Sequence, residues 1–533
     1  MYRFCKRLIA LLLILAMVLC FVACGEDEIN ADSDGKSSKP TGNSAPTNPG
    51  TSQPPTSINM GQTAFTIGEY EVSAAIVNYF YIDAILNYCN QYSYYISYIL
   101  DINAPLNGPS NTDQQGVTWA DKFLNMAIDN LTVTYQLYDQ AQKNGFKLSE
   151  KEEKSIDALV ENLEIYAKFY GFENADAYLS NTYGAGATAE SYRDYCRVHT
   201  IADRYYAEYA DSITYTDNDI REFDAENYWQ YDSYTFEYYY FKVSDFVESS
   251  QPTDDEKAAA IAKAKDYAKA LAAGEYADAD AFDAAINDLM NCTTGEYKAN
   301  RQEDILYQQV PALFRDWLSG QSDAGIAPRE QGDTTVIVNE SGTDDNKTLN
   351  GFYVLRFERI QSNQFNLKNV RHLLVKFEGG TTDAYGNVTY TDAEKAAARN
   401  AALALLAQFE SSDKSEGTFA AMANEHSDDG NGTTGGLYEN IFPGQMVQPF
   451  EDWCYEGGHQ HGDYGIVETQ YGYHIMFFVS DAQLTYRDYM IQQDLLTKDL
   501  TAYLDRLANT AKTELITTEY LNMSLKVSTF YGS

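Results

Sequence analysis

Basic side chains are scarce in this sequence, and their scarcity excludes whole classes of partner. Lysine and arginine number 38 among 533 residues, against 78 aspartate and glutamate residues, so the formal net charge is −40. A surface this acidic repels a phosphate backbone, and we expect no nucleic-acid partner. It also disfavours electrostatic docking on anionic lipid headgroups.

Cysteine is sparse as well, and its spacing fits neither a disulfide framework nor a metal site. Of seven cysteines, three lie in the first 24 residues. The other four are far apart, with no CxxC pair and no histidine at ligand spacing: Cys89, Cys196, Cys292 and Cys454. We predict isolated thiols, no structural zinc and no cofactor.

The apolar run near the N-terminus is too short to span a membrane. Three basic residues, Arg3, Lys6 and Arg7, precede a run of apolar residues at 8–22. A membrane-spanning helix needs roughly 20 such residues. Residues 1–24 are therefore predicted to be a targeting segment, and not part of the fold. An ordinary secretory signal and an uncleaved anchor are the alternatives to a lipoprotein signal in this segment.

Ala23 directly before Cys24 resembles the bacterial lipobox, although Phe21 stands where that motif carries leucine. The resemblance implies that Cys24 is diacylated and anchors the chain at the extracytoplasmic face of the cell membrane. Two acyl chains are enough for stable anchoring. The next residues, 25–62, are rich in Ser, Thr, Asn, Gly and Pro, which predicts a disordered tether.

Residues 63–232 carry the pattern of a mostly helical region. Apolar residues recur at three- and four-residue steps through 118–144, and Gly145 stands where a helix would end. Two capping-box signatures predict the starts of further helices, Ser149-x-x-Glu152 and Thr216-x-x-Asp219.

An internal repeat divides the next part of the chain. The segment 253–260 (TDDEKAAA) matches 391–398 (TDAEKAAA) at seven of eight positions, and Phe314-Arg-Asp-Trp pairs with Phe450-Glu-Asp-Trp. These offsets are 138 and 136 residues, so we predict two copies of one fold, at 233–361 and 362–481. Each copy runs strand, capped helix, short helices, strand. The fold class is therefore α+β, with a helical module followed by two α+β domains.

Five of the six histidines lie in the second copy. His372 and His474 sit in very apolar predicted strands, Arg371–Val375 and Gly472–Met476. A single histidine in such a strand is usually a core residue with satisfied hydrogen bonds. Two histidines on strands that can be neighbours in one small domain indicate a site.

The second copy resembles the parvulins, a family of small peptidyl-prolyl cis–trans isomerases that occur in bacterial secretion foldases. Four motifs follow the family order and spacing: HLLVK from His372, GQM from Gly444, FED from Phe450 and YGYHI from Tyr471. The resemblance implies isomerase activity and the family's site residues. The implied catalytic set is His372, Asp429, Thr469 and His474, and the implied proline pocket is Leu437, Met446 and Phe450. Asp428 is an alternative to Asp429 because the alignment of residues 427–442 is less secure.

Prolyl isomerisation requires few reactive groups in the enzyme. Amide resonance sets the rotational barrier at roughly 18–20 kcal/mol, and an enzyme lowers it by gripping the ring, excluding water and favouring the twisted amide. No nucleophile, metal or cofactor is required. The loop 378–383 has no Arg or Lys cluster, which argues against a preference for phosphoserine-proline.

The first copy departs from the parvulin pattern at the histidines. Tyr238 stands at the His372 position and Tyr353 at the His474 position, while Phe314 is kept. We therefore interpret the first copy as a degenerate, non-catalytic domain. Upstream, the helical region resembles the chaperone-type module of secretion foldases. Residues 482–533 are expected to form a C-terminal helix and tail that return to pack on that module.

These features together favour a lipid-anchored foldase at the outer face of the cell membrane. Its expected partners are unfolded or partly folded secreted polypeptides that contain X-Pro bonds. The alternative is a non-catalytic chaperone lipoprotein that only holds such chains. A solute-binding or adhesive lipoprotein would account for the anchor and tether but not for the motifs.

Overall fold

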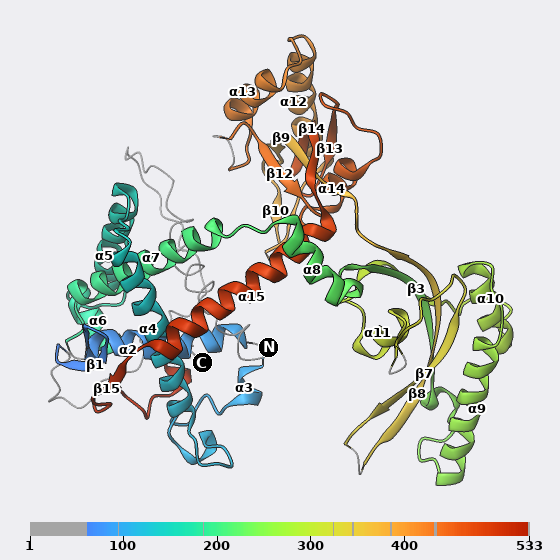
Figure 1. The fold of residues 1–533 in the computed structure, drawn as a ribbon, viewed down its shortest axis with the longest axis horizontal. Helices are drawn as coiled ribbons and strands as arrows, with labels where there is room; N and C mark the ends of the chain where they lie inside the picture. The colour runs from blue at the N-terminus through green and yellow to red at the C-terminus, as the bar shows by residue number, and fades with distance from the viewer. Residues whose placement is uncertain are drawn as a thin grey trace. The chain divides into compact units, whose positions relative to one another are not determined.

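The computed structural model describes residues 61–530 except 94, 185, 323–324, 344–345, 384–385 and 431–433. These residues fall into two compact units, one built from the chain up to Thr214 together with Leu496 onward, the other from Tyr215–Leu495 (Figure 1). The predicted targeting segment 1–24 with Cys24, and the tether up to residue 60, lie outside the described residues.

The first unit is mainly helical, as the sequence predicted. Its helices are α2 (Ala74–Gln91), α3 (Ile96–Ile99), α4 (Trp119–Lys143), α5 (Glu150–Phe169), α6 (Ala175–Tyr183) and α7 (Ala189–Ser212). A small antiparallel sheet, which the sequence did not predict, has the order β15-β1-β2. Its strands are β1 (Thr63–Ile67), β2 (Tyr70–Ser73) and β15 (Thr513–Leu515). The partner β15 comes from the far end of the chain, so no local pattern announces this sheet.

The helix starts follow the capping chemistry read from the sequence. The Ser149 side chain accepts a hydrogen bond from the Glu152 backbone, and the Glu152 side chain accepts one from Ser149 in return. Thr216 and Asp219 form the same box at the start of α8 (Asp217–Asn227). Both predicted capping boxes are confirmed. Gly145, just after α4, has a φ of 71°, a conformation that glycine adopts without strain.

The C-terminal helix α15 (Tyr486–Thr510) enters the first unit at Leu496. There Tyr503, Leu504 and Leu507 pack against Val133 and Leu137 of α4 and Ala202 of α7. The Tyr503 ring stacks on Tyr209 with 4.2 Å between centroids. The helical unit is thus completed by apolar side chains from the end of the chain.

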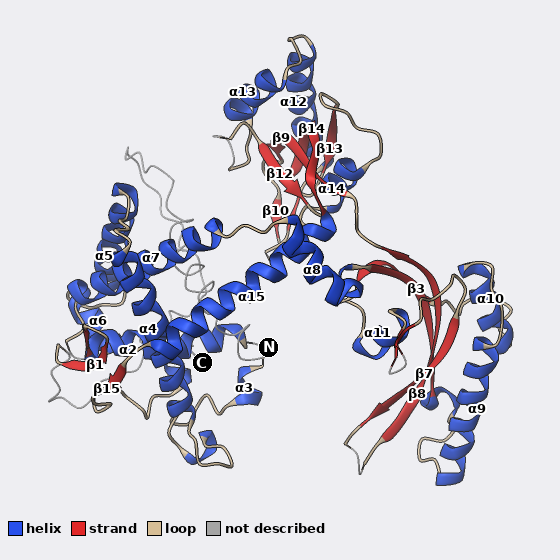
Figure 2. Ribbon diagram, in the orientation of Figure 1, coloured by secondary structure: helices blue, strands red, loops and turns tan. Residues whose placement is uncertain are grey.

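The second unit contains two four-stranded antiparallel sheets (Figure 2). The first has the order β4-β3-β8-β7, from β3 (Ser233–Lys242), β4 (Asn300–Leu306), β7 (Thr334–Ser341) and β8 (Thr348–Gln361). The second has the order β12-β9-β14-β13, from β9 (Asn366–Lys376), β12 (Leu437–Ile441), β13 (Tyr464–Glu468) and β14 (Gly472–Thr485). The strands keep the same order in both sheets, which confirms the predicted repeat.

Strand register shows the correspondence residue by residue. In the second sheet His372 lies opposite Met476, and His474 lies opposite Leu374. In the first sheet Tyr238 lies opposite Leu355, and Tyr353 opposite Tyr240. Tyr238 and Tyr353 therefore occupy in the first sheet the places that the two histidines occupy in the second.

The two faces of the second sheet have different coverings. Helices α12 (Asp392–Glu410) and α13 (Glu416–His426) cover one face, where Leu373, Ile475 and Phe477 lie in the core. The other face packs Val370, Met476 and Phe478 against α14 (Gln448–Tyr455). Because side chains alternate along a strand, His372 and His474 share this second face with α14.

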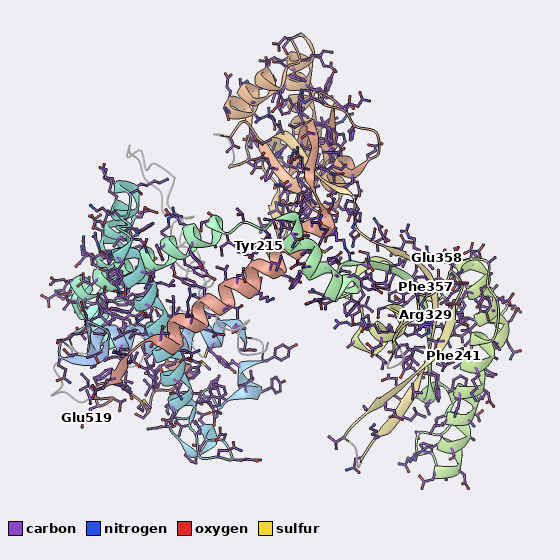
Figure 3. The ribbon with its side chains drawn as sticks, in the orientation of Figure 1. Tyr215, Phe241, Arg329, Phe357, Glu358 and Glu519 are labelled. Atoms are coloured by element: carbon purple, nitrogen blue, oxygen red, sulfur yellow. The ribbon has the colours of Figure 1, made fainter. Side chains whose placement is uncertain are left out.

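The first sheet is covered in the same way. Figure 1 shows α9 (Asp254–Ala272) and α10 (Ala279–Leu289) on one side of it and α11 (Ala312–Leu318) on the other. On the α9 side a fully buried arginine crosses the strands. Arg356 Nη1 is 2.9 Å from Glu237 Oε2 and 2.6 Å from Oε2 of Glu358, which Figure 3 labels. Arg301 also pairs with Glu237.

We expect Arg356→Ala to destabilise the first sheet by about 3 kcal/mol, because the buried Glu237 carboxylate loses its buried partner. Hydrogen–deuterium exchange of the β3 and β8 amides in the full chain measures this loss. The matched control is Arg359→Ala, which breaks an exposed ion pair with Asp304 (2.6 Å) and should cost less than about 1 kcal/mol. Equal exchange in the two variants would contradict the prediction.

Candidate active site

Two buried histidines form the centre of the candidate site. His372 and His474 are only 2% and 5% exposed, and their Nδ1 atoms lie 3.1 Å apart. Their rings come from adjacent strands, β9 and β14, at diagonal positions of the register. The diagonal brings two side chains of the same face together without placing them directly opposite each other.

Two glycines let the backbone close around this pair. Gly436 has a φ of 68°, and a Cβ there would lie 2.0 Å from the His372 carbonyl oxygen. Gly472 begins β14 with a φ of 153°, and a Cβ there would lie 2.1 Å from the Val375 carbonyl oxygen. Any larger residue at either position would push the histidine strands and their neighbours apart.

A line of hydrogen bonds runs outward from the histidines in both directions. On one side His372 Nε2 lies 2.9 Å from Asp429 Oδ2, which also accepts a bond from the Tyr438 hydroxyl at 3.1 Å. On the other side His474 Nε2 lies 2.9 Å from Thr469 Oγ1. The backbone N–H of Tyr471 donates to Thr469 Oγ1 at 3.2 Å, so the hydroxyl is held within its turn.

One arrangement of protons satisfies this whole line with both histidines neutral. If His372 carries its proton on Nε2, it donates to the Asp429 carboxylate, and its Nδ1 accepts from Nδ1–H of His474. His474 Nε2 then accepts from the Thr469 hydroxyl. Every bond points toward Asp429, and we assign these tautomers on that ground.

Burial keeps the histidines in this neutral form. It lowers the pKa of His372, against the opposing pull of the Asp429 carboxylate. It also lowers the pKa of His474 to about 4, with a further contribution from His372. Burial, and then Asp429, raises the pKa of the Tyr438 hydroxyl to about 12, so this group remains a hydrogen-bond donor.

The structure separates the roles of the two adjacent aspartates. Asp429 reaches His372, whereas the Asp428 carboxylate accepts the backbone N–H of Lys376 at 2.9 Å. The Asp428 N–H donates to the Leu374 carbonyl at 2.8 Å. Asp428 therefore ties its loop to β9. Of the two candidates left open by the sequence, Asp429 is the one at the histidine pair, and its side chain is about 30% exposed.

Phe450 and Met446 form an apolar surface, which we call the apolar floor, beside these hydrogen-bonded residues. The Phe450 ring is 5.3 Å from His372 and 5.4 Å from His474, centroid to centroid, and stands nearly perpendicular to both. Met446 packs at the edge of the cluster that contains Phe450. Aromatic and thioether side chains of this kind suit a flat apolar ring.

Leu437 does not reach this site, although the sequence assigned it to the pocket. It pairs with Arg371, whose side chain bonds Glu416 of α13 on the opposite face of the sheet. The next residue, Tyr438, takes the place instead, with its ring 5.0 Å from the His372 ring. No sequence motif points to Tyr438, because only the register of β12 shows which of the two neighbours faces the histidines.

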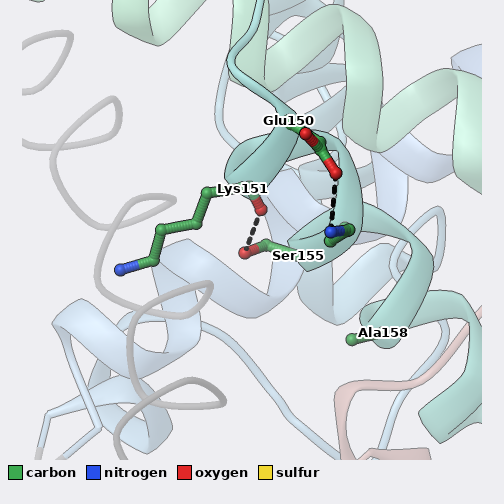
Figure 4. A pocket seen from close by; sticks show the side chains of 5 residues that line it. Glu150, Lys151, Ser155 and Ala158 are labelled. Carbon is green, nitrogen blue, oxygen red and sulfur yellow. Dashed lines mark hydrogen bonds and ion pairs between the residues drawn. The ribbon is translucent and has the colours of Figure 1, made fainter.

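Other parts of the described chain hold weaker candidates for a metal or ligand site. No group of three or more His, Cys, Asp or Glu side chains between residues 61 and 530, gaps excepted, is arranged to hold a metal ion. A shallow hollow on α5 is lined by Lys151, Ser155, Ala158 and an exposed Glu150–Lys154 ion pair of 2.7 Å (Figure 4). The Ser155 hydroxyl in this hollow donates to the Lys151 carbonyl, and we assign the hollow no function.

A family model described as PPIC-type PPIASE domain matches residues 352–481. The match begins within β8 of the first sheet, ten residues before the boundary predicted from the repeat, and covers the whole of the histidine site. No curated protein matches the chain.

Several solved structures resemble parts of the chain. PrsA from Bacillus subtilis is 15% identical, with 80% of this chain and 100% of that chain covered and a TM-score of 0.24. A peptidylprolyl isomerase (PrsA) from Bacillus anthracis is 17% identical, covering 28% and 59%, with a TM-score of 0.17. Peptidyl-prolyl isomerase ESS1 from Candida albicans is 23% identical, covering 22% and 63%, also with a TM-score of 0.17. At these scores the similarities add nothing to the functional argument.

We expect the free energy of unfolding to fall as the pH is lowered from about 6.5 to about 4, by up to roughly 3 kcal/mol for His474 alone. In this window the unfolded chain binds a proton that the native His474 does not, so stability is complete above the unfolded pKa and lost below it. Urea unfolding at pH 7 and pH 5 measures the change. His474→Gln is the control and should lack this component; ring signals of native His474 that titrate near pH 6.5 would contradict the assignment.

Proposed function

We propose that this chain, whose residues 352–481 form a PPIC-type parvulin domain, isomerises X-Pro bonds in unfolded or partly folded polypeptides and thereby acts as a foldase. The observation that carries the proposal is the hydrogen-bonded line from Asp429 through His372 and His474 to Thr469, set beside Phe450. A family match alone would leave open whether the domain is catalytic. The hydrogen bonds from Asp429 to Thr469 are the physical support for catalysis.

The apolar floor accounts for binding of the proline. A pyrrolidine ring laid on Phe450 and against Met446 would leave water, and burial of apolar surface favours this at roughly 25 cal/mol per Å². The adjacent histidines are neutral and buried, so they do not bring solvating water to the amide. A drier amide loses hydrogen bonds that favour its planar, resonance-stabilised form, and the barrier to rotation falls.

Asp429 supplies the charge that acts at the rotating bond. Its Oδ2 is occupied by His372 and Tyr438, and its partly exposed side chain lies at the edge of the site. In the twisted amide the nitrogen becomes pyramidal and more basic, while the carbonyl carbon becomes more like that of a ketone. A carboxylate held beside this bond by two donors can favour that state over the planar one without moving.

The first test is isomerisation of a short X-Pro peptide by the full chain. We expect acceleration over the uncatalysed rate, which has a time constant of tens to hundreds of seconds. Asp429→Asn should lower kcat/KM by about tenfold or more, because it removes at least about 1.4 kcal/mol of stabilisation from the twisted state. Asp428→Asn is the matched control, since Asp428 binds only backbone groups of β9.

The two aspartate variants separate the candidate functions. Equal losses in both would point to damage of the loop and contradict the assigned role of Asp429. A wild-type chain that binds peptides but gives no acceleration would favour the alternative, a non-catalytic chaperone. Tyr238 and Tyr353 lie outside this site, so their substitution should leave kcat/KM unchanged.

We further propose that Cys24 carries a diacyl anchor, which holds the foldase at the extracytoplasmic face of the cell membrane to meet secreted chains. The support is the Ala23-Cys24 step after a short apolar run. In the described part of the chain, no helix is both long and apolar enough to cross a bilayer.

For the anchor, we expect the wild-type chain expressed in a bacterial host to fractionate with membranes and to incorporate labelled palmitate. Cys24→Ser should lose the label and leave the membrane fraction, because one thioether bond carries the lipid. Cys89→Ser is the control, since this buried cysteine belongs to the first unit. Membrane retention of the Cys24→Ser chain would contradict the proposal.

A further inference from the structure

The first copy repeats the ring geometry of the candidate active site with different residues. Ring centroids are separated by 5.4 Å for Tyr238–Phe314, 5.1 Å for Phe314–Tyr353 and 5.8 Å for Tyr238–Tyr353. In the second copy the corresponding distances are 5.3 Å, 5.4 Å and 5.2 Å. The triangle of rings has therefore been kept although both histidines are replaced.

The polar line that accompanies the triangle in the second copy is not repeated. Asp429 stands three residues after the end of α13, and Cys292 stands three residues after the end of α10. The Cys292 N–H bonds back to the Asn287 carbonyl of its own helix at 2.8 Å, and its thiol lies 3.1 Å from the Thr294 hydroxyl. The loop thus folds back onto α10, and the residue at the same count after the helix is a cysteine where the other copy has Asp429.

The tyrosines also make the triangle more accessible. Tyr238 and Tyr353 are half-buried, whereas His372 and His474 are buried. The Tyr353 ring stacks on Tyr240 with 4.1 Å between centroids, which extends the aromatic surface along the sheet. The Phe314 ring beneath Tyr238 and Tyr353 is itself buried. We call Tyr238, Tyr240 and Tyr353, together with this buried ring, the aromatic face.

We infer that the aromatic face binds extended, proline-containing segments of unfolded polypeptides and holds them without isomerising them. Proline rings pack flat on aromatic rings, and a polyproline II segment is already ordered, so little entropy is lost on binding. The backbone carbonyls of such a segment are free to accept hydrogen bonds from tyrosine hydroxyls. The inference rests on the proposed function, because Phe450, the equivalent of Phe314, is assigned there to the proline ring.

The first copy lacks the carboxylate that isomerisation at the second site would use. Asp429 supplies that carboxylate in the second copy, and the residue at the same count after α10 is Cys292. Retention of three rings in register, after loss of the polar groups, is expected for a surface that still contacts ligand through its apolar part. The half-buried tyrosines leave part of each residue exposed, where such a ligand can reach it.

The experiment uses the full chain and a heptapeptide with two central prolines and a photoreactive diazirine group. After irradiation, mass spectrometry maps the cross-linked residues. We expect two labelled regions, one at Phe450 and its neighbours and one on β3, β8 or α11. Tyr353→Ala should reduce labelling of the second of these about fivefold or more, the loss expected for removing one aromatic contact. Tyr353→Phe should retain it.

A second peptide, with both prolines replaced by alanine, tests the ligand class. Weaker labelling of the first copy by this peptide supports the inference, and equal labelling overturns the preference for proline. Labelling confined to the second copy, or unaffected by Tyr353→Ala, overturns the site. Cross-links between two protein chains through the aromatic face would identify a second copy of the chain as the occupant and overturn it as well.

Isomerase activity measured on the same samples keeps the two proposals apart. Tyr353→Ala should leave kcat/KM on a short X-Pro peptide unchanged while labelling of the first copy falls. An inactive wild-type chain that still labels at the aromatic face would defeat the proposed function alone. An active chain without such labelling would defeat this inference alone. Circular dichroism of each variant establishes that the sheet is intact.

Discussion

Ten backbone positions pair β9 with β14, and this antiparallel register places His372 diagonally across from His474. A slip of one residue would turn one histidine toward α12 and α13 and break the Nδ1–Nδ1 contact. The register is held on both faces, by Leu373 and Ile475 on one and by Val370 and Met476 on the other. Glycines at 436 and 472 allow the neighbouring backbone to close on the pair. The site therefore depends on a packed sheet more than on any single functional group.

The same frame is used twice with different side chains. Equal strand order and register put Tyr238 and Tyr353 where the other sheet has histidines, and Phe314 where it has Phe450. The backbone of the sheet determines where the rings meet. The residue types then determine whether a chain of hydrogen bonds can join these rings. Imidazoles accept and donate at opposite edges and so can join a chain of hydrogen bonds. A phenol donates and accepts through the one oxygen at its tip, so it cannot carry the line from one edge of its ring to the other as an imidazole does.

Burial decides the electrostatics of the candidate active site. Loss of solvent lowers the pKa of both histidines and keeps them neutral. Asp429 is the carboxylate at the end of the line, and its side chain is partly exposed at the edge of the site. This arrangement suits a reaction in which an amide twists and no bond to a nucleophile, metal or cofactor is made.

Much of the fold followed from local sequence. Three kinds of local pattern were readable from the sequence, and each depends on residues close together in the chain. They are the capping boxes at Ser149 and Thr216, the repeat around Thr253 and Thr391, and the apolar strands that carry His372 and His474. The sheet of β1, β2 and β15 could not be predicted, because its strands come from opposite ends of the described chain. Nor could the choice of Tyr438 over Leu437. Asp429 was assigned from the resemblance to the parvulins, but only the structure separates it from Asp428. A sequence motif does not show which of two adjacent residues points toward the histidines. The pairing of their strand or loop with a distant strand decides this.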